Sequence, residues 1–313
     1  MSRQWKSIVV VIVDPHRAEQ AALAKAAAMA ERAGARVTLL NTFMVPAPPA
    51  KAMSTEDVLQ TGIQERLVRL GRLARTLERR GVAVDCAVEW DFPVHEAIVR
   101  YVLKHGPDLL IAESHHHNPL ARMFLANTDW ELIRACPCPV WFVRARKLPA
   151  APKVLVAVDP RHTHAKPAKL DDRLLAAANR LTGQLGGEVC MAHVCPGPAY
   201  GGATIMEPIR WPTRGGGRVD AATKALVDRL GARHGVKPAN RVLQVGDATE
   251  VLPTIAKKVH ADVLVMGAVS RSRTRQYFIG NTAEKVIDHV DCDVLIVKPA
   301  NFKTPVKRAR RKL

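Results

Sequence analysis

Residues 267–282, GAVSRSRTRQYFIGNT, contain the residue types from which a phosphate-binding loop is built. They follow the apolar run Val263–Met266 and combine a glycine, several arginines and a Gly-Asn-Thr triplet. Glycine lets the backbone approach an anion closely, and a helix N-terminus presents free N–H groups to phosphate. The stretch has no GxGxxG and no lysine before Ser/Thr, so it is neither a Rossmann fingerprint nor a P-loop.

The sequence contains no recognisable catalytic machinery. There is no G-x-S-x-G nucleophile elbow and no Walker A lysine, so we predict a protein that is not an enzyme, with at most very slow ATP hydrolysis and no catalytic residue. Three consecutive histidines, residues 115–117, cannot all point one way, and Cys136-Pro-Cys138 leads directly into an apolar strand. We interpret these as a loop and buried thiols, and predict no metal site.

The chain contains one pattern twice. Residues 7–15 (SIVVVIVDP) and 153–160 (KVLVAVDP) are apolar runs that end in Asp-Pro. Residues 108–144 align without a gap with 262–298, a shift of 154 residues. A shift of this size is a domain's length, so we infer a duplicated domain. We place the first domain at 1–147, the second at 152–300 and a basic tail at 301–313.

Each copy alternates short apolar runs with segments of helical periodicity. Strands are expected near residues 7–14, 36–42, 82–89, 108–113, 139–144, 153–158, 188–194, 240–245, 262–267 and 293–298. Helices are expected near residues 17–34, 55–80, 93–105, 127–136, 170–185, 218–235, 248–259 and 281–290. This alternation predicts an α/β fold with a parallel sheet covered on both faces, which binds ligands at the carboxyl ends of its strands.

Composition and charge limit the cellular locations and partners that the sequence allows. No apolar run reaches the ~18 residues of a membrane span, and the first apolar run ends in Asp14-Pro15 without a signal-peptide cleavage site. The six cysteines lack the spacing of a disulfide framework, which favours a reduced, cytoplasmic location. The net charge is +18, of which six charges lie in residues 303–313. This basic surface and tail are either a solvated face and end or a contact for nucleic acid and other polyanions.

These features together resemble the universal stress protein family. The motifs that carry the resemblance are an Asp closing the first strand, a G-x2-G-x9-G-[S/T] pattern after the fourth, and the segments GNTAEKVIDHVDCDVLIVKP and TDWELIRACPCPVWFV. The resemblance covers nearly the whole chain apart from its tail, and the duplication is similar to the family's tandem-domain members. It implies two adenine nucleotide alpha hydrolase-like, Rossmann-like domains of five strands, paired through their fifth strands as an intramolecular pseudo-dimer, with a homodimer of the whole chain as a further option.

The resemblance also implies an adenine-nucleotide site in the second domain, for ATP or AMP with its bound magnesium. The residues that match the family's pattern, or replace it, are Asp159, Gly267, Ser270, Gly280, Asn281 and Thr282. Two of them depart from the pattern, since Ser270 replaces the middle glycine and Asn281 follows the last one. Asn281 or Thr282 can instead simply cap the following helix, which uses the same groups.

The first domain departs much further from the pattern. Its aligned positions are Glu113, His116, Ala126, Asn127 and Thr128, so all three glycines are absent. Glu113 places a negative charge where phosphates would lie, which opposes nucleotide binding. We therefore predict no nucleotide in this half and a structural role, with Asn127 or Thr128 as a helix cap.

The resulting hypothesis is a cytoplasmic, non-enzymatic stress-response protein whose second domain binds an adenine nucleotide. Two alternatives belong to other classes. One is a basic protein that associates with nucleic acid through its surface and tail. The other is a binding module in which the altered pocket takes a ligand that is not a nucleotide.

Overall fold

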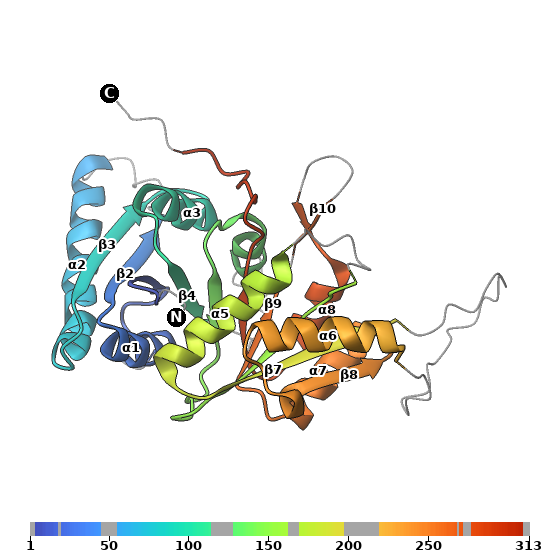
Figure 1. Ribbon diagram of the computed structural model, residues 1–313. Coiled ribbons are helices and arrows are strands. Elements are labelled where there is room, and N and C mark those ends of the chain that lie inside the picture. Colours follow the sequence, from blue (N-terminus) through green and yellow to red (C-terminus); the bar gives the residue numbers. More distant parts are fainter. Residues whose placement is uncertain are drawn as a thin grey trace.

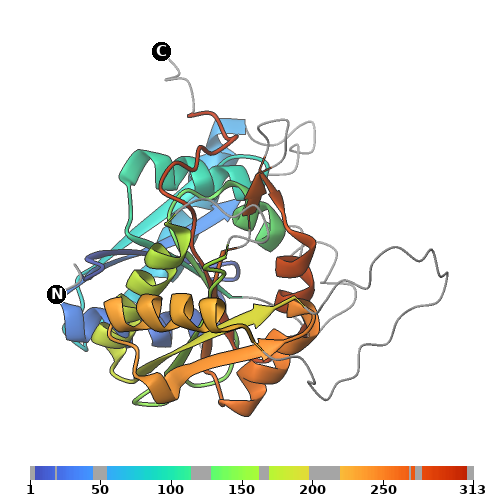
Figure 2. The same ribbon diagram turned by 45° about the vertical axis from the view of Figure 1, so that its right-hand side comes forward.

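The computed structural model describes residues 4–17, 20–44, 55–113, 128–161, 169–196, 219–267, 269–271 and 277–308 of the 313-residue chain. Its centre is a ten-stranded sheet in the order β3-β2-β1-β4-β5-β12-β9-β6-β7-β8. The first half of the chain supplies one side of the sheet and the second half the other, as the colours in Figures 1 and 2 show. The α/β class expected from the apolar runs is therefore confirmed.

The strands that form the sheet are short and mostly buried. They are β1 (Ser7–Val11), β2 (Arg36–Phe43), β3 (Val84–Trp90), β4 (Leu109–Glu113), β5 (Val140–Val143), β6 (Lys153–Ala157), β7 (Glu188–Cys195), β8 (Arg241–Val245), β9 (Val263–Met266) and β12 (Asp293–Ile296). A separate antiparallel hairpin, β10 (Val269–Arg271) with β11 (Tyr277–Ile279), lies between β9 and the next helix. The sequence did not predict this hairpin, because its strands are short and carry no alternating apolar pattern.

Helices cover both faces of the sheet, as expected for buried parallel strands. They are α1 (Ala21–Ala33), α2 (Thr55–Glu78), α3 (Val94–His105), α5 (Leu170–Leu185), α6 (Ala221–Arg233), α7 (Ala248–Lys258) and α8 (Asn281–His289), with a 3-10 turn η1 (Pro238–Asn240). Residues 128–135 are also helical. One apolar core joins α1, α2, α5 and α6 to their face of the sheet, and a second joins α3, 128–135, α7 and α8 to the other.

The two halves meet through their last strands. β5 and β12 pair antiparallel, with Trp141 opposite Leu295, whereas the other neighbouring strands of this sheet are parallel. This pairing confirms the expected intramolecular pseudo-dimer. Within each half the order is third, second, first, fourth and fifth strand, so the strand order reverses between the first and fourth strands. For the second half this switch point lies between β6 and β9.

A buried ion pair crosses the junction. Lys25 of α1 places its Nζ 2.7 Å from a carboxylate oxygen of Asp293, at the start of β12, and both side chains are less than 5% exposed. Lys25 Nζ also donates to the carbonyl of Arg144 at 2.9 Å, and the Arg144 N–H donates to Asp293 at 3.0 Å. Burial raises the pKa of Asp293, and the neighbouring Lys25 ammonium opposes this. The ion pair therefore links helix α1 of the first half directly to the second half's last strand.

Candidate functional site

The predicted site lies at the switch point of the second half. Val156 of β6 is paired with Val265 of β9 in parallel register, so both strands end at the same edge of the sheet. Asp159 and Gly267 follow these strands directly. Open α/β sheets bind ligands at this position, outside the carboxyl ends of the strands where the order reverses. The structure thus brings together two predicted site residues that are far apart in the sequence.

Asp159 is held in place by the helix that follows it. Its backbone N–H donates to the Asp171 carboxylate at 3.1 Å, and Asp171 lies in the first turn of α5 and is only 5% exposed. The Asp159 side chain itself is half-buried. A carboxylate in the first turn of a helix is also favourably placed in the field of the helix dipole. Asp171 was not singled out from the sequence, because nothing marks a helical aspartate as a partner for a strand end.

A second contact at this edge involves His193 of β7. The His193 Nδ1 lies 3.0 Å from the carbonyl oxygen of Val158, and the side chain is 1% exposed. In the first half Asn41 takes the corresponding role, donating from its amide to the carbonyl of Ile12 at 2.6 Å. Each copy therefore uses a buried polar side chain from its second strand to fix the end of its first.

A side chain at position 267 would have to displace the buried end of Leu170. A Cβ on Gly267 would lie 2.8 Å from Cδ2 of Leu170, the first residue of α5, which is 1% exposed. Real Cβ atoms essentially never come so close to another heavy atom. The space that the sequence pattern reserves for the approach of a phosphate is thus next to a leucine. That Gly267 also faces a nucleotide stays a prediction.

Replacing Gly267 with alanine should destabilise the protein even without any ligand. The new methyl group meets Leu170, and overpacking of a buried site typically costs about 1–3 kcal/mol. Chemical denaturation of the two proteins, followed by circular dichroism, measures the loss. Gly71→Ala, within helix α2, is the matched control, because none of the described residues has an atom within 4 Å of a Cβ there. A loss for Gly71→Ala as large as that for Gly267→Ala would contradict this account.

Gly280 is the N-cap of helix α8. The interpretation that Asn281 or Thr282 caps this helix is therefore wrong, since these residues are its first two helical positions. Within the part of the chain that the structure describes, no atom lies within 4 Å of a Cβ built on Gly280. Ser270 lies in β10, paired with Phe278 of β11; the side chains of Ser270 and Asn281 lie outside the described part of the structure. A helix start with this geometry offers backbone N–H groups to an anion.

In the first half a carboxylate supplied by the chain itself occupies the corresponding strand end. Glu113, aligned with Gly267, accepts a hydrogen bond from the backbone N–H of Ala21, the first residue of α1. Its second oxygen lies 3.2 Å from the Arg17 guanidinium, and its side chain is 11% exposed. The predicted negative charge is thus neutralised within the protein. Thr128 is the first described residue of the following helix, and Asn127 lies outside the described residues.

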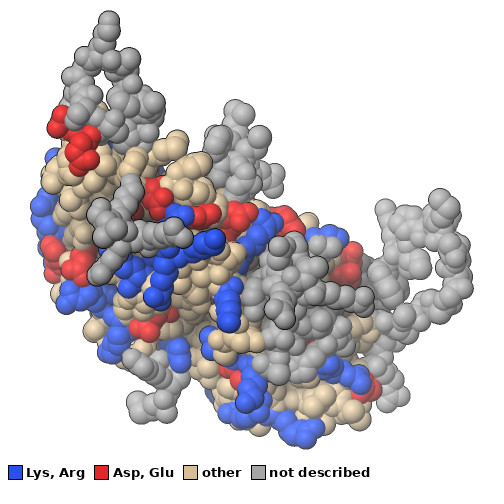
Figure 3. Space-filling model, turned by 90° about the horizontal axis from the view of Figure 1, so that it is seen from above, with Lys and Arg blue, Asp and Glu red and all other residues tan. Residues whose placement is uncertain are grey.

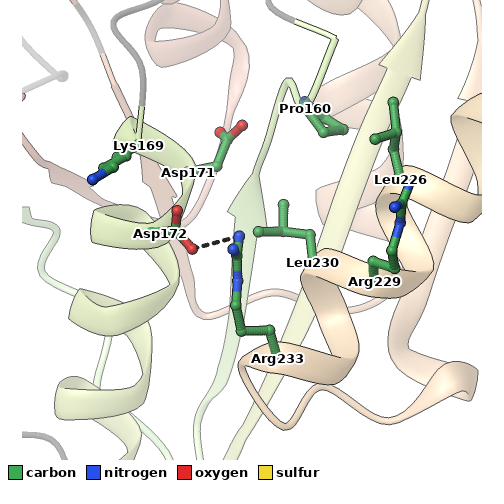
Figure 4. Close-up of a pocket in the computed structure, with 8 residues that line it drawn as sticks. All are labelled: Pro160, Lys169, Asp171, Asp172, Leu226, Arg229, Leu230 and Arg233. Atoms are coloured by element: carbon green, nitrogen blue, oxygen red, sulfur yellow. Dashed lines mark ion pairs between the residues drawn. The ribbon is translucent and has the colours of Figure 1, made fainter.

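A cavity of about 500 Å³ lies beside the site, between α5 and α6. Its walls include apolar side chains and charges of both signs, and Figure 4 shows Asp172 paired with Arg233 across it, at 2.7 Å. Pro160, the residue after Asp159, forms part of the wall, but Asp159, Gly267 and Gly280 do not. The described cavity therefore adjoins the predicted nucleotide site and does not coincide with it.

Metal ligands and charge complete the description. Among the described residues no group of three or more His, Cys, Asp or Glu side chains is arranged to hold a metal ion. His115–His117 lie outside those residues. The six cysteines are free thiols.

Lys and Arg side chains are spread over both halves of the face in Figure 3, with acidic side chains among them. None of the helices in the described ranges is long and apolar enough to span a membrane.

The fold defines a class: two copies of a five-stranded α/β domain, joined into one sheet. The family model "Universal stress protein family" matches residues 6–144 and again 151–298. The chain therefore belongs to the universal stress protein family. The resemblance inferred from its motifs is confirmed.

Curated relatives and solved structures extend over nearly the whole chain. Universal stress protein E of Escherichia coli K12 is 29% identical over 313 residues, and the match covers 96% of each chain. The Photorhabdus laumondii protein of the same name is 27% identical, covering 96% of this chain and 98% of its own. A putative universal stress protein from Pseudomonas aeruginosa is 25% identical with a TM-score of 0.64, covering 94% of both chains. One from Archaeoglobus fulgidus, at 16% identity, has a TM-score of 0.65 and covers 94% of this chain and 97% of its own.

Proposed function

We propose that this protein is a non-enzymatic, cytoplasmic stress-response factor whose second half binds an adenine nucleotide, ATP or AMP. The observation that carries the nucleotide assignment is the start of α8. The N-cap there is Gly280, and no atom of the described residues lies within 4 Å of a Cβ at that position. Helix N-termini of this kind bind phosphate through free N–H groups and the helix dipole. Family membership and the twofold match support the assignment to a stress response.

The two halves differ in a way that supports one nucleotide for each chain. In the second half the fourth strand ends in Gly267, which adds no charge. In the first half it ends in Glu113, whose carboxylate already takes a backbone N–H of α1. A phosphate would have to displace this carboxylate from the start of α1 and from its ion pair with Arg17. We therefore assign ATP or AMP, with magnesium carried by the nucleotide, to the second half only.

Titration calorimetry with ATP and with AMP tests this proposal on the full chain. The parent protein should bind one equivalent, and Gly280→Arg, which fills the open space at the start of α8, should abolish the heat. Ala126→Arg is the matched control, because Ala126 is aligned with Gly280 in the first half and its replacement should leave the affinity unchanged. Absence of heat from the parent at millimolar ATP would refute nucleotide binding.

Native mass spectrometry of the purified protein separates the remaining alternatives. A retained mass that matches an adenine nucleotide supports the proposal. A retained mass of another kind would favour a binding module with a different ligand. Binding to DNA or RNA that falls steeply with salt, and falls further when residues 303–313 are deleted, would favour the basic surface and tail as the functional part.

A further inference from the structure

Two cysteines of the first half lie in contact with each other. Cys136 and Cys138 flank a proline in the turn between the helical residues 128–135 and strand β5. Their Sγ atoms are 3.6 Å apart, and the residues are 0% and 9% exposed. A disulfide requires sulfurs at about 2.05 Å, so bond formation needs a movement of about 1.5 Å within one short turn. The pair is thus close to a bonding arrangement while both thiols are free.

A buried amine from the second half faces this pair. Lys298 follows strand β12 and is 1% exposed, and none of the described residues gives its Nζ a hydrogen-bond partner. Burial lowers the pKa of this amine, and Cys136 and Cys138 are near enough to oppose that shift in part. The ring of Phe302, in the C-terminal segment, lies 4.8 Å from Nζ. A buried amine without a partner is rare enough to require an explanation.

The duplication provides an internal comparison for this group. In the second half, Val290 and Cys292 take the positions of Cys136 and Cys138, and Arg144 takes the position of Lys298. Arg144 donates to the carbonyl oxygens of Cys292 at 3.2 Å and Val290 at 2.5 Å. The turn in the second half therefore has one thiol, and hydrogen bonds to two carbonyl oxygens hold the guanidinium of Arg144 beside it. The first copy's turn instead has two thiols in contact, and among the described residues the amine at the position aligned with Arg144 has no hydrogen-bond partner.

We propose that Cys136, Cys138 and Lys298 form a peroxide-reactive dithiol site in which the thiols close to a disulfide and Lys298 acts as the base. Cys138 is the attacking thiol, because it is the more exposed of the two. Cys136 is the resolving thiol, because its sulfur is already in contact with that of Cys138. The oxidant is hydrogen peroxide or a small organic hydroperoxide.

The reaction balances in two steps. In the first, the Cys138 sulfur attacks one peroxide oxygen and the O–O bond breaks; Lys298 takes the thiol proton and passes a proton to the leaving hydroxide, giving a sulfenic acid and water. In the second, the Cys136 sulfur attacks the sulfenic sulfur, and the S–O bond breaks with release of a second water. Two thiols lose two electrons and two hydrogens, and one peroxide is reduced to two waters.

The protonation states of the group explain why a base is needed. The shared hydrogen bond with Cys136 and burial hold the pKa of the Cys138 thiol well above its ordinary value, so free thiolate is scarce. Burial lowers the pKa of Lys298 to about 7. A base is most effective when its pKa is near the working pH, and a neutral amine at pH 7 meets this condition. By contrast, burial and the Asp293 charge raise the pKa of the Cys292 thiol to about 12.

Intact-mass measurement on the reduced full-length protein tests the proposal. After peroxide treatment we expect the loss of two hydrogen masses, mapped by digestion under non-reducing conditions to the peptide that contains Cys136 and Cys138. Cys292→Ala, the matched control in the second copy, should lose the same mass at the same rate. Cys136→Ala should instead accumulate a sulfenic acid on Cys138, trapped by dimedone. Thiols that stay reduced under peroxide that oxidises free dithiothreitol, or a disulfide elsewhere, would overturn the proposal.

The role of Lys298 is tested separately by the pH dependence of the rate. Lys298→Met should slow disulfide formation at neutral pH by about 10²-fold, the usual contribution of a positioned base. The parent rate should rise through an inflection near pH 7, and this inflection should be absent in the variant. Equal rates and equal profiles for the two proteins would remove Lys298 from the reaction. Because the parent's own profile needs no variant, the proposal stays testable even if Lys298→Met folds poorly.

Discussion

Replacing Lys25 with methionine should lower the free energy of unfolding by about 3–5 kcal/mol, because it leaves the Asp293 carboxylate buried without its counter-charge. Both side chains are less than 5% exposed, so water cannot replace the lost partner. The remaining donor, the backbone N–H of Arg144, supplies a single hydrogen bond. Denaturation by urea, followed by circular dichroism, measures the difference between parent and variant.

The double variant Lys25→Met/Asp293→Leu distinguishes the loss of a partner from the loss of a favourable interaction. Removing both members of a buried ion pair is often neutral or stabilising, so the double variant should recover most of the stability that Lys25→Met loses. Arg36→Ala is the surface control, since its pair with Asp85 is 63% and 51% exposed and should change stability by less than about 1 kcal/mol. If Lys25→Met loses no more than Arg36→Ala, the pair is not a buried one in solution.

The second large effect concerns Lys298 and pH. Burial lowers the pKa of this amine from an ordinary 10.5 to about 7. Between these values the unfolded chain holds a proton that the folded chain does not, so the stability of the parent rises with pH in this window. Below pH 7 the amine is charged in both states, and the full penalty of burying a charge remains. Lys298→Met removes that penalty, so the variant should be the more stable protein at about pH 6.

The measurable result is the difference in free energy of unfolding between Lys298→Met and the parent, which should decrease as pH rises. Each pKa unit corresponds to about 1.4 kcal/mol, so the advantage of Lys298→Met should shrink by on the order of 2 kcal/mol between about pH 7 and pH 9. Denaturation curves of both proteins at several pH values give this gap. Lys303→Met, at an exposed position of the same segment, should show a gap that does not change with pH. A constant gap for Lys298→Met would show that its amine is solvated.

The strands could be predicted because local sequence determines them. Runs such as SIVVVIVDP and DVLIV are apolar on both faces, and only a strand covered by helices on both sides buries them fully. The pairing of β5 with β12 followed from the resemblance to a family with known domain pairing. The hairpin β10–β11 was missed, since residues 269–271 and 277–279 carry no alternating pattern that separates them from a loop.

The candidate site was predictable only in part, because its contacts join distant parts of the chain. The position of Asp159 and Gly267 at one edge follows from strand order, but the contact of Gly267 with Leu170 depends on how α5 packs. No sequence pattern indicates that Glu113 accepts the Ala21 N–H, or that Lys298 is buried without a hydrogen-bond partner among the described residues. These contacts arise from tertiary packing across helices and across the two halves.

The antiparallel union of β5 and β12 has an evolutionary consequence. In a dimer of identical subunits, every substitution is present on both sides, so a change that closes one ligand site closes the other. Here the partner is covalently attached, so pairing no longer depends on protein concentration. One copy can then change freely while the other retains its chemistry. Glu113 where the second half has Gly267, and Cys136 where it has Val290, are differences that a dimer of two identical chains could not carry on one side alone.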